Sequence, residues 1–142
     1  MRARIKWLDN MSFVAESGSG HSVVLDGSPE NGGRNLGVRP MESVLIGLGT
    51  CAAFDVILML KKARQQVVDC EVSLEAERAD AVPAVFTRVE MVFAVVGNDL
   101  SEKQVRRVVD LSVEKYCSVA KMLAHSVEIT HRVEITGAVK DD

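Results

Sequence analysis

The chain has 142 residues, of which 47% are hydrophobic and only 4% aromatic, and its formal net charge is -3. This length suits one domain, so we expect a single domain over residues 1–142 with a core of aliphatic side chains and methionine. The acidic balance argues against a nucleic-acid partner, which normally requires a basic stripe.

The N-terminus and the cysteines indicate the compartment. Residues 1–6 are charged and lead into no apolar segment of the kind that a secretory signal peptide contains. The three cysteines are an odd number at wide spacing, so we expect no structural disulfide framework. The sequence therefore predicts a cytoplasmic protein with free or catalytic thiols.

Three short runs at the start of the chain predict an antiparallel meander of strands. The strands are expected at residues 2–8, 12–16 and 21–25. In the first strand, Ile5 and Trp7 alternate with basic residues, which predicts one buried and one solvated face. Residues 26–38 are rich in Gly, Asn and Ser and predict a loop.

The longest element is expected at residues 40–64, as one helix that is apolar on almost every face. Pro40 suits the first helical position, because the N–H that it lacks would have no partner there. Glycines and carboxylates interrupt the run too often for a good membrane span. A helix that is apolar all round belongs in a core or an interface. We therefore expect a buried central helix, with the Cys51 thiol at a tight crossing among small residues.

The remainder of the chain combines strands with two helices. Strands are expected at residues 68–75, 84–96 and 127–135, the first two as a hairpin. Ser101 and Gln104 form a capping box that begins a helix, and a short second helix is expected at residues 118–125. This order predicts an α+β fold with antiparallel sheets. Because these elements give the long helix too little cover, we expect a homodimer whose interface buries part of it.

Alternation predicts which side chains of these elements face the core. In the first hairpin strand the inward set is Val68, Cys70, Val72 and Leu74. In the second strand, Phe86 is expected on the face opposite Val89 and Met91. The helix after Ser101 presents one face made of Val105, Val108, Val109, Ser112, Val113 and Tyr116.

Cys51 is the first candidate for chemistry. A free cysteine in an apolar helix is often an inert core residue, and this alternative stands beside that of a reactive thiol. Reactivity requires a lowered thiol pKa. A position three turns into a helix does not provide it, because the dipole effect fades within the first turn. An activating cation must therefore come from another part of the assembly.

Arg39 and Glu42 are the nearest ionisable residues upstream of Cys51. Along a helix axis Arg39 lies about 18 Å and Glu42 about 13.5 Å from that thiol, with Glu42 on the opposite side. If either residue acts on Cys51, we expect it to do so across a dimer interface. The alternative is that Glu42 complements the helix dipole while Arg39 is a solvated loop cation.

Cys117 is the second candidate, because it lies at the junction of two helices. A cysteine at a helix N-terminus gains thiolate character, and the alternative is a packing residue. Cys70 is expected to be a structural residue of its strand. The histidines and cysteines lack zinc-site spacing, and the glycine-rich loop lacks the spacing of a phosphate-binding loop. We therefore expect no metal and no cofactor.

Three segments of the chain resemble the OsmC/Ohr family of thiol-dependent organic hydroperoxide reductases. They are Arg39–Glu42, Gly47–Cys51 and Cys117–Lys121. The resemblance covers essentially the whole chain, and it implies an intertwined homodimer with a site at each end of the interface. It also implies that Cys51 is the peroxidatic cysteine, which peroxide oxidises to a sulfenic acid. Cys117 would be the resolving cysteine, and an external dithiol would reduce the resulting disulfide.

The chain departs from the family pattern at three points while keeping both thiols. Met41 occupies the first acidic position after Pro40, so that only Glu42 is acidic there. In the first hairpin, where the family has its activating arginine, this chain reads Ser-Gly-Ser-Gly-His at residues 17–21, and Arg39 is a candidate substitute. Near the end of the chain, Cys-Ser-Val replaces Cys-Pro-Val.

The resemblance implies a cytoplasmic peroxidase of the oxidative stress response that acts on organic hydroperoxides, with no nucleic-acid or membrane partner. The alternative, which belongs to another class of function, is a non-catalytic thiol redox sensor or small-molecule binding protein on the same scaffold.

Overall fold

The computed structural model describes residues 1–137 and 139–140. The chain forms two compact units, an N-terminal unit of residues 1–46 and a C-terminal unit from Gly47 onward. The single domain over residues 1–142 stays a prediction.

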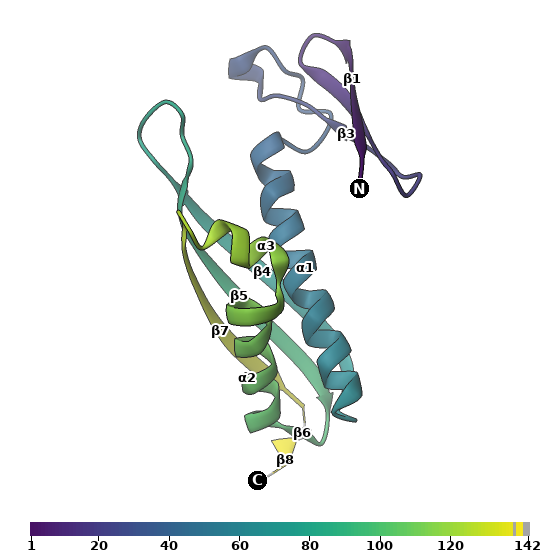
Figure 1. Ribbon diagram of the computed structural model, residues 1–142, viewed down its shortest axis with the longest axis vertical. Helices are drawn as coiled ribbons and strands as arrows, with labels where there is room; N and C mark the ends of the chain where they lie inside the picture. Colours follow the sequence, from purple (N-terminus) through teal and green to yellow (C-terminus); the bar gives the residue numbers. More distant parts are fainter. Residues whose placement is uncertain (138, 141–142) are drawn as a thin grey trace. The chain divides into compact units, whose positions relative to one another are not determined.

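The N-terminal unit is built on a three-stranded antiparallel sheet in the order β1-β2-β3 (Figure 1). Its strands are β1 (Ala3–Asp9), β2 (Ser12–Ser17) and β3 (Ser22–Leu25). The predicted meander is therefore confirmed. The loop that follows contains a short 3-10 helix, η1 (Pro29–Asn31).

The expectation of a half-buried first strand is wrong. All seven residues of β1 are exposed, and the Trp7 side chain is 62% accessible. Alternation marks the face of a strand that is able to be buried, but burial requires a second layer to pack on that face. Residues 1–46 by themselves form only one sheet.

The long helix is confirmed as α1 (Pro40–Lys62). It ends before Arg64, whose φ of 57° is in the left-handed region that commonly terminates helices. Only one face is buried, through Leu48, Gly49, Ala52, Val56 and Leu60. Phe54 is 69% exposed on another face, so burial on every side is wrong for the single chain.

The tight crossing on α1 is found at Gly49. A Cβ atom at this position would lie 2.7 Å from Leu74 Cδ1 on β4 (Gln66–Arg78), whereas one at Gly47 would meet nothing within 4 Å. By length and composition α1 would also reach across a membrane. On its covered face, Leu48, Ala52, Val56 and Leu60 are fully buried in the C-terminal unit.

The C-terminal unit has a three-stranded sheet in the order β4-β5-β7. Its further strands are β5 (Phe86–Asn98) and β7 (Glu128–Thr136). The predicted hairpin is confirmed by the antiparallel β4–β5 pair. The prediction of antiparallel sheets is wrong for β7, which runs parallel to β5. Parallel strands require a long crossover connection, and here helices provide it.

The crossover consists of α2 (Glu102–Leu111), a π-helical turn η2 (Ser112–Tyr116) and α3 (Ser118–Leu123). The N–H of Gln104 donates to Ser101 Oγ, which confirms Ser101 as the N-cap. The second bond of the predicted capping box is replaced, because the Ser101 N–H donates to Gln65 Oε1 at 2.8 Å. Tyr116 is half exposed rather than inward, because the wider π turn shifts the face of the helix. Two short strands, β6 (Leu100–Ser101) and β8 (Val139–Lys140), pair parallel.

Two irregularities of register change which side chains point inward. A shift between Val67 and Asp69 leaves Val68 exposed, so its predicted inward orientation is wrong. A second shift, between Glu77 and Arg78, leaves Thr87 on β5 as an extra residue. Phe86 is therefore buried as Val89 is, and its predicted place on the opposite face is wrong. An extra residue in one strand reverses the alternation beyond it.

Candidate active site

Cys51 lies in the middle of α1, on the edge of the buried face. It is half-buried, while Ala52 and Leu48 on the same helix are inaccessible. The helix therefore presents one thiol that is partly accessible beside a stretch that is packed into the C-terminal unit. A thiol in this position is open to a reagent that approaches the uncovered face of α1.

Cys117 is completely buried at the junction of η2 and α3. It is the N-cap of α3: the N–H of Ala120 donates to its sulfur at 3.4 Å. The thiol is itself 3.9 Å from the carbonyl oxygen of Leu48, to which it donates. A residue on α1 one turn before Cys51 is thus in direct contact with the Cys117 sulfur.

The electrostatics of Cys117 show that the two thiols interact. The pKa of Cys117 is raised to about 11, mainly by burial, and a hydrogen bond and charge from the Cys51 thiol contribute to this rise. The N–H groups of Ala120 and Val119 act in the opposite direction. The structure therefore brings together Cys51 and Cys117, which are far apart in sequence, and keeps Cys117 protonated at neutral pH.

Ser112 is a component of the site that sequence reasoning did not single out. Its buried hydroxyl donates to the carbonyl oxygen of Ala52 at 2.9 Å, next to Cys51. Its own carbonyl accepts the N–H of Cys117 at 2.8 Å across the π turn. The available signal was a lone serine in a stripe of valines on the inner face of a helix.

Arg39 and Glu42 are both engaged at the start of α1. The Arg39 backbone N–H donates to Glu42 Oε2 at 2.9 Å, in the manner of a capping box. The charge of Arg39 also contributes to lowering the pKa of Glu30, after hydrogen bonds from Ser28 and the backbone. These contacts match the alternative in which the two residues serve the N-terminus of the helix and do not act on a thiol. Action on a thiol stays a prediction for both residues.

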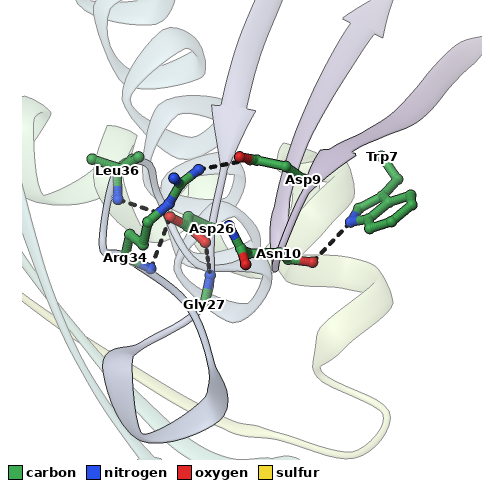
Figure 2. A network of polar contacts seen from close by, with 7 residues as sticks. All are labelled: Trp7, Asp9, Asn10, Asp26, Gly27, Arg34 and Leu36. Atoms are coloured by element: carbon green, nitrogen blue, oxygen red, sulfur yellow. Dashed lines mark hydrogen bonds and ion pairs between the residues drawn. The ribbon is translucent and has the colours of Figure 1, made fainter.

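A carboxylate orders the loop that leads to α1. Asp26 accepts the N–H groups of Gly27, Arg34 and Leu36 at 2.7 to 3.1 Å, as Figure 2 shows. The Leu36 bond makes the largest contribution to lowering the pKa of Asp26, and burial opposes it. The Arg34 side chain reaches Asp9 at 2.6 Å, so that a β1 residue is also attached to this loop.

The third cysteine has a different setting. Cys70 is half-buried on β4, and burial followed by the negative charge of Asp69 raises its pKa. A thiol with a raised pKa is a poor nucleophile at neutral pH. Among residues 1–137 and 139–140, no three His, Cys, Asp or Glu side chains are grouped so as to hold a metal ion.

Comparison with known proteins agrees with this architecture. The chain is 49% identical to protein YhfA of Escherichia coli strain K12 over 138 residues, which cover 97% of this chain and 100% of YhfA. An OsmC-like protein from Mycoplasma pneumoniae has the same fold at 16% identity, with a TM-score of 0.81 over 95% and 96% of the two chains. An organic hydroperoxide resistance protein from Elizabethkingia anophelis superimposes with a TM-score of 0.73 at 15% identity, over 94% of each.

The sequence profile described as OsmC-like protein matches residues 32–132, a span that includes α1, Cys51 and Cys117. This chain therefore belongs to the OsmC-like protein family.

Proposed function

We propose that the protein is a thiol-dependent peroxidase that reduces organic hydroperoxides. The observation that carries this proposal is the pairing of a partly accessible thiol, Cys51, with a buried one, Cys117, across α1 and the α2–α3 junction. The hydroperoxide resistance named for the structural neighbour from Elizabethkingia anophelis supports the same chemistry. The oxidative stress response in the cytoplasm is the setting that we infer.

Cys51 performs the first step because it is the more accessible of the two sulfurs. Its thiolate attacks one peroxide oxygen and the O–O bond breaks. The sulfur becomes a sulfenic acid, and the other oxygen takes a proton and leaves as the alcohol. Phe54, about one helical turn after Cys51, exposes an apolar side chain to solvent, which favours an organic hydroperoxide over hydrogen peroxide.

Cys117 performs the second step. Its sulfur bonds to the Cys51 sulfur, the S–OH bond breaks, and the hydroxyl leaves as water. The pKa of about 11 means that Cys117 still carries its proton at neutral pH. This proton accompanies the departing hydroxyl, so the water forms without an external acid. An external dithiol then reduces the disulfide and restores both thiols.

Activation of Cys51 requires a cation or a hydrogen-bond donor, and we propose that a second copy of the chain provides it. Phe54 and Leu58 leave an apolar strip exposed on α1, which suits a helix that packs against another α1 in a homodimer. Arg39 and Glu42 of that second copy are the candidates for the activating pair, with the Glu42 carboxylate bound to the Arg39 backbone N–H. We propose no metal, cofactor, nucleic acid or membrane in this reaction.

The test is consumption of cumene hydroperoxide and of hydrogen peroxide with a dithiol reductant. Cys51→Ser should abolish turnover. Cys117→Ser should retain one equivalent of rapid peroxide reduction and then turn over slowly, because the sulfenic acid lacks its partner. Cys70→Ser is the matched control, and it should behave as the wild type. Full turnover in both the Cys51 and the Cys117 variant would reject the proposal.

A non-catalytic thiol sensor or small-molecule binding protein is the second candidate. It is favoured by Met41, which stands where the reductases that this chain resembles have an acidic residue. It is also favoured by the turn at residues 17–21 between β2 and β3, which reads Ser-Gly-Ser-Gly-His and contains no arginine. The rate of Cys51 alkylation against pH discriminates the two functions. A Cys51 pKa near the free-thiol value of about 8.5 favours the sensor, and a value well below it favours the peroxidase.

A further inference from the structure

Ser112 is hydrogen-bonded to both segments that carry the thiols. Its hydroxyl donates to the carbonyl oxygen of Ala52, the residue that follows Cys51 on α1, at 2.9 Å. Its carbonyl oxygen accepts the N–H of Cys117 at 2.8 Å. Ser112 therefore connects the backbone next to Cys51 with the backbone of Cys117 itself. Its side chain is completely inaccessible to solvent.

The surroundings of Ser112 indicate why a serine is present. It continues an inner face of α2 and η2 that is otherwise made of Val105, Val108, Val109 and Val113, all buried. A hydroxyl in such a place lowers the stability of the fold unless it finds a partner. Alanine would satisfy packing alone, so the contact with Ala52 is what distinguishes serine at this position.

The backbone at Ser112 is also unusual. The bond from Cys117 N–H spans five residues, which makes the turn π-helical rather than α-helical. Such turns are rare and occur often at functional sites. This turn ends the run of α2 and delivers Cys117 to the N-cap position of α3, where its sulfur meets Leu48 of α1.

We propose that Ser112 is a positioning residue that sets the spacing of Cys51 and Cys117 and so determines how readily the two thiols form a disulfide. The inference rests on the proposed function for its biological purpose, because the disulfide is the product of the resolving step. The spacing itself requires no peroxide. Ser112 touches no reacting atom and acts through the backbone of α1 and η2.

The experiment is a glutathione redox titration of the full chain. One oxidised glutathione takes the two electrons of the thiol pair and leaves as two reduced glutathiones, while Cys51 and Cys117 lose their protons and form the S–S bond. For Ser112→Ala we expect the equilibrium constant for disulfide formation to fall about tenfold, or about 30 mV in potential, because one buried hydrogen bond is lost.

Two further variants separate positioning from general destabilisation. Ser112→Thr and Ser112→Val add the same bulk and differ in the hydroxyl, so Thr should retain the wild-type potential more closely than Val. Ser101→Ala removes the cap at the other end of α2 and destabilises the helix without touching the thiol segments. It should leave the potential unchanged.

The outcomes distinguish this inference from the proposed function. If the wild type, Ser112→Ala, Ser112→Thr and Ser112→Val all had the same redox potential, the positioning role would be overturned. The proposed peroxidase function would be unaffected by that result. A wild type that forms no Cys51–Cys117 disulfide in glutathione would overturn it as well. A shifted potential in a protein that consumes no peroxide would support the positioning role and reject the peroxidase.

Discussion

The two units of this chain bury different kinds of side chain. In the N-terminal unit the buried residues are all polar: Ser12, Asp26 and Ser28. In the C-terminal unit the inaccessible side chains are mostly apolar, and Phe93 is the largest of them. The first unit is thus organised by hydrogen bonds to one carboxylate, whereas the second is organised by packing.

This difference shows that a regular sheet does not by itself make a core. The strands β1, β2 and β3 satisfy their backbone, but Ile5, Trp7 and Val23 remain exposed. Because hydrophobic stabilisation follows the apolar area removed from water, this unit gains little of it alone. In the homodimer proposed above, we expect the second copy to cover these exposed apolar side chains in addition to the strip on α1.

The largest effect is expected from the packed unit. Phe93→Ala should lower the free energy of unfolding by about 3–5 kcal/mol, because it leaves a cavity in the core. Urea unfolding measures this value. Val68→Ala, on the exposed side of the same sheet, is the control and should change it by less than about 0.5 kcal/mol. A similar loss of unfolding free energy in both variants would contradict the view that packing organises the C-terminal unit.

Trp7 tests the uncovered sheet. Its ring N–H donates to the Asn10 carbonyl at 2.8 Å, which holds the exposed ring in one orientation (Figure 2). Trp7→Ala should weaken self-association about tenfold, because an oriented tryptophan is a typical interface anchor. Sedimentation equilibrium measures the dissociation constant. Val82→Ala, which changes a fully exposed apolar side chain, should have no effect, and an unchanged constant for Trp7→Ala would place the interface elsewhere.

Asp26 should make the N-terminal unit sensitive to acid. Its folded pKa lies below its ordinary value of 3.8, so its contribution to stability is present above pH 3.8 and is lost as the pH falls through the folded pKa. The Leu36 amide resonance should follow this titration by NMR. Asp26→Asn should abolish the titration and loosen the loop at every pH, while Asp9→Asn leaves the titration in place. A midpoint above 3.8 would show that the hydrogen bonds do not favour the carboxylate.

The smallest effect is expected at the Arg34–Asp9 pair. The two side chains are 2.6 Å apart but about half exposed, and such pairs contribute about 0.2–1 kcal/mol. Arg34→Met should reduce stability by that amount at low salt and by less at high salt. Urea unfolding at two ionic strengths measures it, and a loss above about 2 kcal/mol would mean that the pair has a larger structural role.

Much of the fold could be predicted because its signals are local. Pro40 and the apolar run after it predicted α1, and Ser101 with Gln104 predicted the start of α2. The direction of β7 was missed, although the signal was there: two helices between β5 and β7 are the crossover that a parallel pair needs. The inward face of β4 was not predictable, because nothing in the residues around Val68 marks the bulge.

The candidate site was predictable only in part. Cys51 and Cys117 were each a candidate from the residues around them, but their pairing came only from a resemblance, since neither helical periodicity nor composition relates two residues on separate elements. The distinction between them is a matter of burial, which depends on tertiary packing. Ser112 had a local signal, a polar residue in a valine stripe, but its partner on α1 is 60 residues away in sequence.

The bond from Ala120 N–H to the Cys117 sulfur gives the molecule a spectroscopic reporter. Any change in that sulfur, whether it loses a proton, bonds to another sulfur or takes up oxygen, alters the chemical shift of the Ala120 amide proton. The Ala120 resonance would thus follow the redox cycle in real time, with no label attached to either cysteine.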